Sequence, residues 1–165
     1  MSKSLDDLHA AFAGESQANR RYLAFAKKAD DEGYPAAARL FRAAAAAETV
    51  HALSHFRAAG DVKSTAENLQ TAINGENYEH TTMYPAFIAD AEAEKDKKAL
   101  NSFRFANEVE KVHEMLYKKA LENLSKDAPV VEYYVCPVCG NTFEGSAPDR
   151  CPICNTPSSK FEKIS

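Results

Sequence analysis

The sequence comprises 165 residues, of which 27% are charged, and it carries a formal net charge of −4. This acidic balance argues against nucleic acid as the main partner, because phosphate backbones are bound by clustered basic residues. No apolar run approaches the roughly 20 residues that a membrane-spanning helix needs, and residues 1–7 lack the apolar core of a signal peptide. We therefore expect a soluble cytoplasmic protein.

Two long helices are predicted between Ser4 and Gly60. The first begins near Ser4, whose hydroxyl can cap it, and stops at Gly33. Pro35 suits the first turn of the second helix, which runs through an alanine-rich stretch to about Ala59.

Two more helices are predicted between Ser64 and Lys126. Ser64-Thr-Ala-Glu67 is a capping box and opens the third helix. Neither Gly nor Pro separates the third helix from the fourth, so we place the break near residues 94–96, where Asp96 can act as the cap. The fourth helix should end at about residues 124–126.

The composition changes from Pro129 onward, where the chain becomes rich in Tyr, Val, Pro, Cys and Gly. We therefore predict a helical domain over residues 1–128 and a small second domain over residues 129–165. Tyr133, Tyr134, Phe143 and Phe161 should form the core of the small domain.

All four cysteines lie in the small domain, where they form two separate Cys-Pro-x-Cys pairs. They are Cys136, Cys139, Cys151 and Cys154. In a reducing compartment such pairs favour a tetrahedral metal site over disulfides. The spacing alone does not distinguish iron from a structural zinc ion. A domain this small should owe much of its stability to the metal.

The most informative feature of the helical region is a repeated pattern of metal-ligand residue types. Each half carries a Glu that is followed, after a nearly equal interval, by Glu-x-x-His. The six residues are Glu15, Glu48 and His51 in the first half and Glu76, Glu110 and His113 in the second. Residues three apart share a helix face, so the Glu and His of each pair can direct their ligand atoms toward the same position. Four helices arranged in this way can hold a pair of iron or manganese ions.

The positions of these glutamates match the predicted turns. In an antiparallel hairpin, residues equidistant from the turn lie at the same height. The midpoint of Glu15 and Glu48 falls at residues 31–32, and that of Glu76 and Glu110 falls at residue 93. Ordinary surface glutamates, which are the alternative interpretation, would not be expected to match the turns.

The segment Gly75-Glu-Asn-Tyr-Glu-His-Thr-Thr-Met-Tyr-Pro85 resembles the rubrerythrins, non-haem di-iron peroxidases of the ferritin-like superfamily. The resemblance extends over nearly the whole chain, including the cysteine-rich end, which is similar to rubredoxin. It implies an all-α ferritin-like four-helix bundle followed by a rubredoxin-like domain. It also implies two Fe ions at the carboxylate and histidine site and one Fe at the four-cysteine site.

The resemblance further implies roles for four residues in catalysis. Glu79 corresponds to the additional glutamate of the family, which one iron exchanges for the residue at His51 on reduction. A fifth carboxylate would offset the larger charge of two Fe(III) ions. Tyr22 and Tyr84 should hydrogen-bond the ligand carboxylates, unless they are simply core tyrosines. Three further histidines are expected to have surface or packing roles: His9, His55 and His80.

The function that the resemblance implies is reduction of hydrogen peroxide to water. This reaction takes two electrons, which two Fe(II) ions supply together, and the four-cysteine centre is a suitable one-electron relay. The sequence has no nucleotide-binding glycine loop, so we expect electrons from an external NAD(P)H-dependent reductase or a rubredoxin. Two alternatives are a ferroxidase or other iron-handling protein, and a non-catalytic electron carrier or redox sensor.

The connection between the second and third helices raises the question of a domain swap. In ferritin-like bundles these helices run parallel, which would separate Gly60 from Ser64 by roughly 35 Å. Four residue steps reach at most about 14 Å. The chain is therefore either a simple up-down-up-down bundle or a domain-swapped homodimer, and the parallel arrangement of the family favours the swap.

Overall fold

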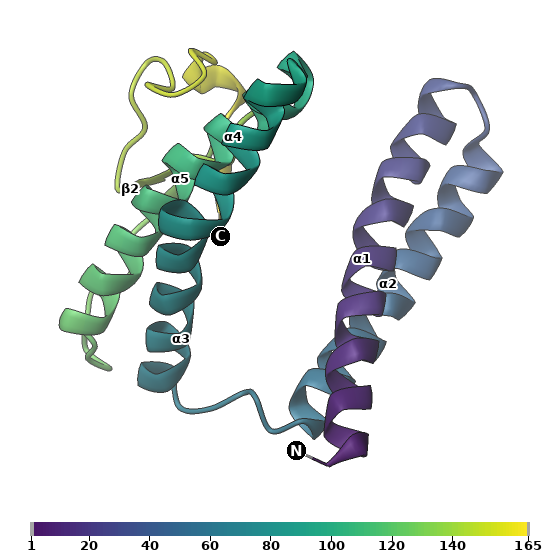
Figure 1. Cartoon of the computed structure of the whole chain (residues 1–165), viewed down its shortest axis with the longest axis horizontal. Helices are drawn as coiled ribbons and strands as arrows, with labels where there is room; N and C mark the ends of the chain where they lie inside the picture. The colour runs from purple at the N-terminus through teal and green to yellow at the C-terminus, as the bar shows by residue number, and fades with distance from the viewer. Residues whose placement is uncertain (1, 165) are drawn as a thin grey trace. The chain divides into compact units, whose positions relative to one another are not determined.

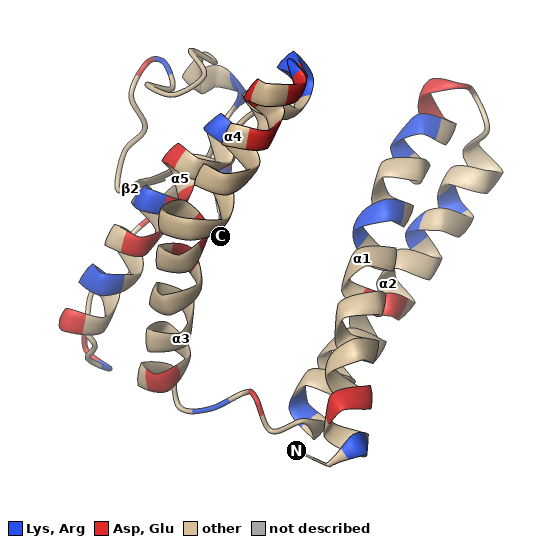
Figure 2. Cartoon of the chain, in the orientation of Figure 1, with Lys and Arg blue, Asp and Glu red and all other residues tan. Residues whose placement is uncertain are grey.

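The computed structural model describes residues 2–164 and divides the chain into two units, which separate between Lys63 and Ser64. Figure 1 shows a helical hairpin in the first unit, and helices with a small sheet in the second. Acidic and basic residues are interspersed along the helices of each unit (Figure 2). Among the described residues, no helix has both the length and the apolar character that a bilayer crossing requires.

The first unit is the hairpin of α1 (Lys3–Asp31) and α2 (Pro35–Ala58). Gly33 ends the α1 region with a φ of 81°, and Pro35 is the first residue of α2, as predicted. The start of α1 differs from the prediction, since the cap is Ser2 and not Ser4. The reason is that the Ser2 hydroxyl accepts a hydrogen bond from the Leu5 amide at 3.3 Å, which leaves Ser4 within the first turn.

Alanines allow α1 and α2 to pack closely. The buried residues of the pair are Ala26, Ala29, Ala38, Ala45 and Ala52. The rings of Phe12 and Phe56 stack with centroids 4.6 Å apart and pack α1 against α2 at the end of the hairpin away from Gly33. The hairpin still leaves large apolar side chains exposed, among them Leu23, Phe25 and Leu53.

The second unit begins with a nearly continuous helical segment in three parts. These are α3 (Thr65–Tyr78), the π-helical turn η1 (Glu79–Met83) and α4 (Tyr84–Glu94). The capping box of Ser64 and Glu67 is present, as predicted. The π-helical turn was not predicted, because an inserted residue in a helix has no clear composition signal.

The helix α5 (Lys97–Glu122) follows a sharp break and packs against α3 and α4. Lys95 adopts a left-handed conformation with φ of 59°, and the Asp96 side chain accepts hydrogen bonds from the amides of Lys98 and Ala99. The predicted break and cap are therefore confirmed. The end of α5 comes at Glu122, slightly before the predicted position.

The cysteine-rich segment forms a three-stranded antiparallel sheet with the order β2-β1-β3. The elements are β1 (Tyr133–Val135), β2 (Thr142–Glu144), the short 3-10 turn η2 (Ser158–Lys160) and β3 (Glu162–Ile164). The stacked rings of Phe143 and Phe161 lie 5.1 Å apart. The strand β2 contacts α5, where Lys119 and Glu144 form an ion pair.

Candidate metal centres

The first unit brings together the three predicted ligands of its half of the sequence. Ligand atoms of Glu15 on α1 and of Glu48 and His51 on α2 all lie within 4.8 Å of one another. Nδ1 of His51 lies 2.7 Å from Oε2 of Glu48. The side chain of Glu48 is 18% exposed, whereas that of His51 is 56% exposed. This group therefore lies on an open face of the hairpin.

The second unit repeats the arrangement with Glu76 from α3 and with Glu110 and His113 from α5. Their ligand atoms also lie within 4.8 Å of one another. Nδ1 of His113 is 2.7 Å from Oε2 of Glu110 and 3.8 Å from Oε2 of Glu76. We call these two groups the first and second half-sites. The equal heights predicted from the sequence explain why each hairpin brings its two glutamates level.

The electrostatics of the second half-site favour a bound cation. Burial, followed by a hydrogen bond to Glu110, raises the pKa of Glu76 to about 7. Burial opposes ionisation of Glu110 as well, but hydrogen bonds with His113 and Glu76 lower its pKa overall. The hydrogen bond to Glu110 raises the pKa of His113. The group thus retains protons where a divalent cation would replace them, and its oxygen and imidazole donors suit iron.

Glu79 is the first residue of η1 and lies next to the second half-site. Burial raises its pKa, and so does the charge of Glu110, while the charge of His113 lowers it. The ligand atoms that converge within 4.8 Å are those of Glu76, Glu110 and His113, so Glu79 lies just beyond the group. Its role as an additional metal ligand stays a prediction.

Two tyrosines lie close to the same carboxylates. Burial raises the pKa of Tyr84, and the charge of Glu110 adds to the effect. Burial likewise raises the pKa of Tyr117, and the charge of Glu76, followed by that of Glu110, adds to the effect. We did not predict Tyr117 from the sequence, although it follows His113 by four residues and so shares its helix face.

Tyr22 has an aromatic environment on the first unit. Its ring lies 6.4 Å from that of Phe25 and 6.3 Å from that of Phe41. These contacts fit the core interpretation of Tyr22. The hydrogen bond from its hydroxyl to a ligand carboxylate stays a prediction.

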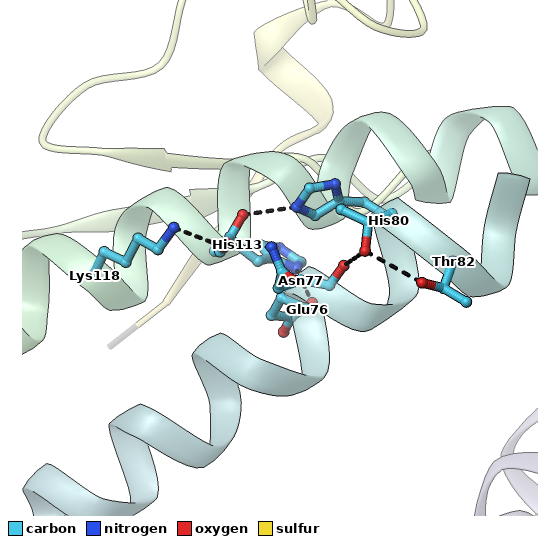
Figure 3. Close-up of polar contacts among 8 residues, drawn as sticks. Glu76, Asn77, His80, Thr82, His113 and Lys118 are labelled. Atoms are coloured by element: carbon cyan, nitrogen blue, oxygen red, sulfur yellow. Dashed lines mark hydrogen bonds and ion pairs between the residues drawn. The ribbon is translucent and has the colours of Figure 1, made fainter.

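A polar cluster around a buried carboxylate lies beside the second half-site (Figure 3). Its centre is Glu114 on α5, which is 8% exposed. Glu114 contacts Asn77, His80 and Lys118 at distances between 2.7 and 3.0 Å. Hydrogen bonds from Lys118 and His80, with that from Asn77, lower the pKa of Glu114 to about 2. His80 is therefore not a surface residue but one partner of a buried carboxylate.

The four predicted cysteines converge in the small sheet domain. Their Sγ atoms lie within 4.8 Å of one another, and Cys136 and Cys151 are buried. Each pair forms a knuckle in which the amide of Gly140 or Asn155 donates to the carbonyl of the first cysteine at 2.9 Å. Both of these residues have positive φ, 84° and 62°, which lets the chain turn around the sulfur atoms.

The chemistry of the four thiols fits a thiolate metal centre. Burial raises the pKa of Cys139, as do the neighbouring thiols, so this thiol keeps its proton unless a metal ion replaces it. Two polar side chains also approach the sulfur atoms. The Thr156 hydroxyl lies 3.1 Å from Sγ of Cys154, and Nδ2 of Asn141 lies 3.9 Å from Sγ of Cys151.

A short polar path connects the four-cysteine site with the second half-site. Nε2 of His113 lies 3.0 Å from Oγ1 of Thr142, the first residue of β2. The same hydroxyl donates to the carbonyl of Gly140 at 3.2 Å. Gly140 is bonded directly to Cys139. Sequence reasoning missed Thr142, because nothing in its local pattern shows that β2 lies against α5.

Comparison with known proteins identifies both parts of the chain. Residues 6–121 match the family described as Rubrerythrin, and residues 134–162 match the Rubrerythrin, rubredoxin-like domain. Rubrerythrin-2 of Clostridium acetobutylicum is 37% identical, over 95% of this chain and 94% of the relative. Rubrerythrin of Porphyromonas gingivalis is 39% identical, over 99% of this chain and 90% of the relative.

A solved structure shows the same similarity. Nigerythrin in its fully reduced, all-ferrous state aligns with a TM-score of 0.60 and 35% identity, over 99% of this chain and 88% of that one. The predicted ferritin-like domain with a rubredoxin-like domain is therefore confirmed. The predicted iron cofactors are confirmed as those of the family, and both groups of candidate ligands are present.

Proposed function

Because the chain belongs to the rubrerythrin family, we propose that it is a peroxidase that reduces hydrogen peroxide to water. The family supports an oxidoreductase with a di-iron site and a rubredoxin-like domain. The observation that carries the finer proposal is the polar path from Cys139 to His113, which suits an enzyme in which one centre supplies electrons to the other.

The two irons would be held by the two half-sites together with Glu79. The residues are Glu15, Glu48, His51, Glu76, Glu79, Glu110 and His113. When bound, the irons supply the two electrons that, with two protons, convert one hydrogen peroxide molecule into two water molecules. Glu79 offers a further carboxylate for the more highly charged oxidised state.

Two tyrosines beside the second half-site can act as hydrogen-bond donors. The raised pKa values of Tyr84 and Tyr117 keep both phenols protonated at neutral pH. Their hydroxyls can therefore donate hydrogen bonds to carboxylates or to a peroxide oxygen.

His113 has a different role, because its two ring nitrogens face different groups. Nδ1 faces Glu110 and the second half-site, while Nε2 faces Thr142.

The second iron centre would restore the electrons one at a time. Cys136, Cys139, Cys151 and Cys154 would hold this iron. The peptide of Gly140 and the hydroxyl of Thr142 then give a short route to the imidazole of His113. The external donor that we propose is an NAD(P)H-dependent reductase or a rubredoxin.

Each half-site supplies only part of a di-iron centre, so the two must combine. We propose that they do so in a domain-swapped homodimer, because four residue steps from Gly60 to Ser64 cannot span the roughly 35 Å of a parallel arrangement. The exposed apolar side chains of the first unit support association with further helices. Leu23, Phe25 and Leu53 are each more than 40% exposed.

Anaerobic mixing of the reduced, iron-loaded protein with hydrogen peroxide tests the proposed activity. We expect one peroxide to oxidise two Fe(II) rapidly, with water as the product and no release of iron. Oxidation that proceeds equally well with oxygen, followed by release or storage of Fe(III), would instead indicate a ferroxidase. Slow oxidation that leaves the carboxylate-bound Fe(II) intact would indicate an electron carrier.

A further inference from the structure

The turn that carries Glu79 is attached to α5 through one buried carboxylate, that of Glu114. Oε1 of Glu114 accepts a hydrogen bond from Nδ2 of Asn77 at 3.0 Å. Oε2 lies 2.7 Å from Nε2 of His80. The side chains of Glu114 and His80 are only 11% and 14% exposed, so water does not weaken this contact greatly.

The two partners of Glu114 on the α3–η1 segment alternate with the two carboxylates of that segment. Asn77 follows Glu76, and His80 follows Glu79. Adjacent helical residues point about 100° apart, so Asn77 and His80 are directed away from the side that carries the carboxylates. Figure 3 shows Asn77 and His80 on the α3–η1 segment, reaching toward α5.

The same alternation occurs on α5, where Glu114 follows His113. On each of the two helical segments, a residue of a metal-ligand type is therefore followed directly by a polar residue that contacts the other segment. We define the Glu114 cluster as Glu114, Asn77 and His80. This cluster fixes the rotation of the α3–η1 segment about its own axis relative to α5.

A π-helical turn needs such support, because it is a less favourable conformation than a continuous α-helix. Such turns are frequent at functional sites. Within the turn, the Thr81 hydroxyl donates to the carbonyl of Asn77 at 2.6 Å. This hydrogen bond occupies a carbonyl that lies at the start of the irregular stretch. The local contact and the Glu114 cluster thus stabilise the same short segment.

We propose that Glu114 is a positioning residue, which holds η1 through Asn77 and His80 so that Glu79 is presented to the di-iron site. The inference rests on the proposed role of Glu79 as a metal ligand. It goes beyond that role because it assigns the placement of Glu79 to a carboxylate that is not among the candidate metal ligands. Loss of the cluster should let η1 change its local geometry and carry Glu79 away.

Hydrogen–deuterium exchange of the full metal-free chain tests the first half of the inference. Glu114→Ala and His80→Ala should accelerate amide exchange in residues 76–84. Glu114→Gln should be intermediate, because its amide can still accept from Asn77. The matched control is Lys118→Met, which removes the contact of Glu114 within α5 but leaves both contacts to the α3–η1 segment. Equal exchange in Glu114→Ala, His80→Ala and the unaltered protein would overturn the inference.

Binding of Fe³⁺ tests the second half, after the four-cysteine site has been filled with Zn²⁺, because Glu79 is proposed as a ligand of the oxidised site. We expect Glu114→Ala to weaken Fe³⁺ binding, measured by competition with a chelator, by about 10- to 100-fold, as loss of groups that orient metal ligands does elsewhere, and to alter the absorption spectrum of the bound iron. His9→Gln removes a more exposed histidine–carboxylate contact of similar length, with Asp61, and should change neither. An unchanged affinity and spectrum in Glu114→Ala would contradict the inference.

The Glu79→Ala variant separates this inference from the proposed function. If Glu79→Ala alters Fe³⁺ binding while Glu114→Ala does not, Glu79 retains its role and the positioning by Glu114 is wrong. If Glu79→Ala leaves Fe³⁺ binding unchanged, the proposed role of Glu79 fails, and so does its presentation by Glu114. Should Glu114→Ala fail to fold, as judged by circular dichroism, His80→Ala and Glu114→Gln decide both measurements.

Discussion

Nε2 of His113 lies 3.0 Å from Oγ1 of Thr142, although the two residues are separated by 29 positions in the chain. One belongs to the longest helix of the second unit and the other to the cysteine-rich sheet. The contact makes one imidazole the neighbour of both metal centres. It also gives the two centres a connection that can be removed without touching a proposed ligand.

Replacing Thr142 with valine should slow electron transfer between the centres. Thr142→Val preserves shape but removes the hydroxyl that contacts His113 and Gly140. We expect a several-fold slower reoxidation of the reduced four-cysteine centre by the oxidised di-iron site in stopped-flow absorption. Oxidation of the fully reduced di-iron site by peroxide should stay close to normal. An unchanged reoxidation rate would show that electrons take another route.

Replacing Thr156 with valine should instead change the reduction potential of the four-cysteine centre. The Thr156 hydroxyl lies 3.1 Å from Sγ of Cys154, and hydrogen bonds to thiolate sulfur stabilise the reduced, more negative state. We therefore expect Thr156→Val to lower the potential by tens of millivolts in spectroelectrochemical titration. Thr142→Val serves as the control and should leave the potential nearly unchanged. A potential that rises in Thr156→Val would contradict this explanation.

Metal binding at the second half-site should release more protons in mild acid than in mild alkali. The pKa of Glu76 is raised to about 7, and that of His113 is raised as well. Both groups must lose their protons to bind a metal ion. Titration calorimetry in buffers of different ionisation enthalpy should show greater proton release at about pH 6 than at about pH 8.5. Proton release that does not depend on pH would contradict these shifts.

The stability of the metal-free protein should also depend on Glu76. Between pH 4.5 and about 7, Glu76 is ionised in the unfolded chain but protonated in the folded one. The unfolded chain binds fewer protons in this window, so the free energy of unfolding falls as the pH rises, by on the order of 2 kcal/mol. Urea denaturation with excess chelator measures the fall, and Glu76→Gln should reduce it.

Complementation between two inactive variants tests the domain swap. Glu48→Ala damages the first half-site and Glu110→Ala damages the second. A swapped heterodimer of the two chains contains one doubly damaged site and one intact site. Coexpression in equal amounts should therefore restore about a quarter of the sites, since half of the dimers are mixed. Iron content and peroxide turnover that stay at the level of the single variants would reject the swap.

The sequence predicted the parts of the site that depend on local spacing. Glu48 with His51 and Glu110 with His113 converge because residues three apart share a helix face. The break at Asp96 was predictable from its capping side chain, although neither Gly nor Pro marks it. The knuckles of the four-cysteine site likewise follow from short, regular spacings.

The parts that the sequence did not predict depend on contacts between distant segments. Thr142 lies beside His113 only because β2 packs on α5. His80 has no local signal of its role, since its partner Glu114 lies 34 positions away. The π-helical turn of η1 was missed because one additional residue in a helical turn has no clear signal in composition.

The most direct test of the whole account is an iron count combined with Mössbauer spectroscopy of the oxidised protein. The account predicts three irons per chain, with one in a tetrahedral thiolate environment and two as a spin-coupled diferric pair with oxygen and nitrogen ligands. One iron per chain, entirely of the thiolate type, would contradict it, because the two Glu and His half-sites would then hold no di-iron centre.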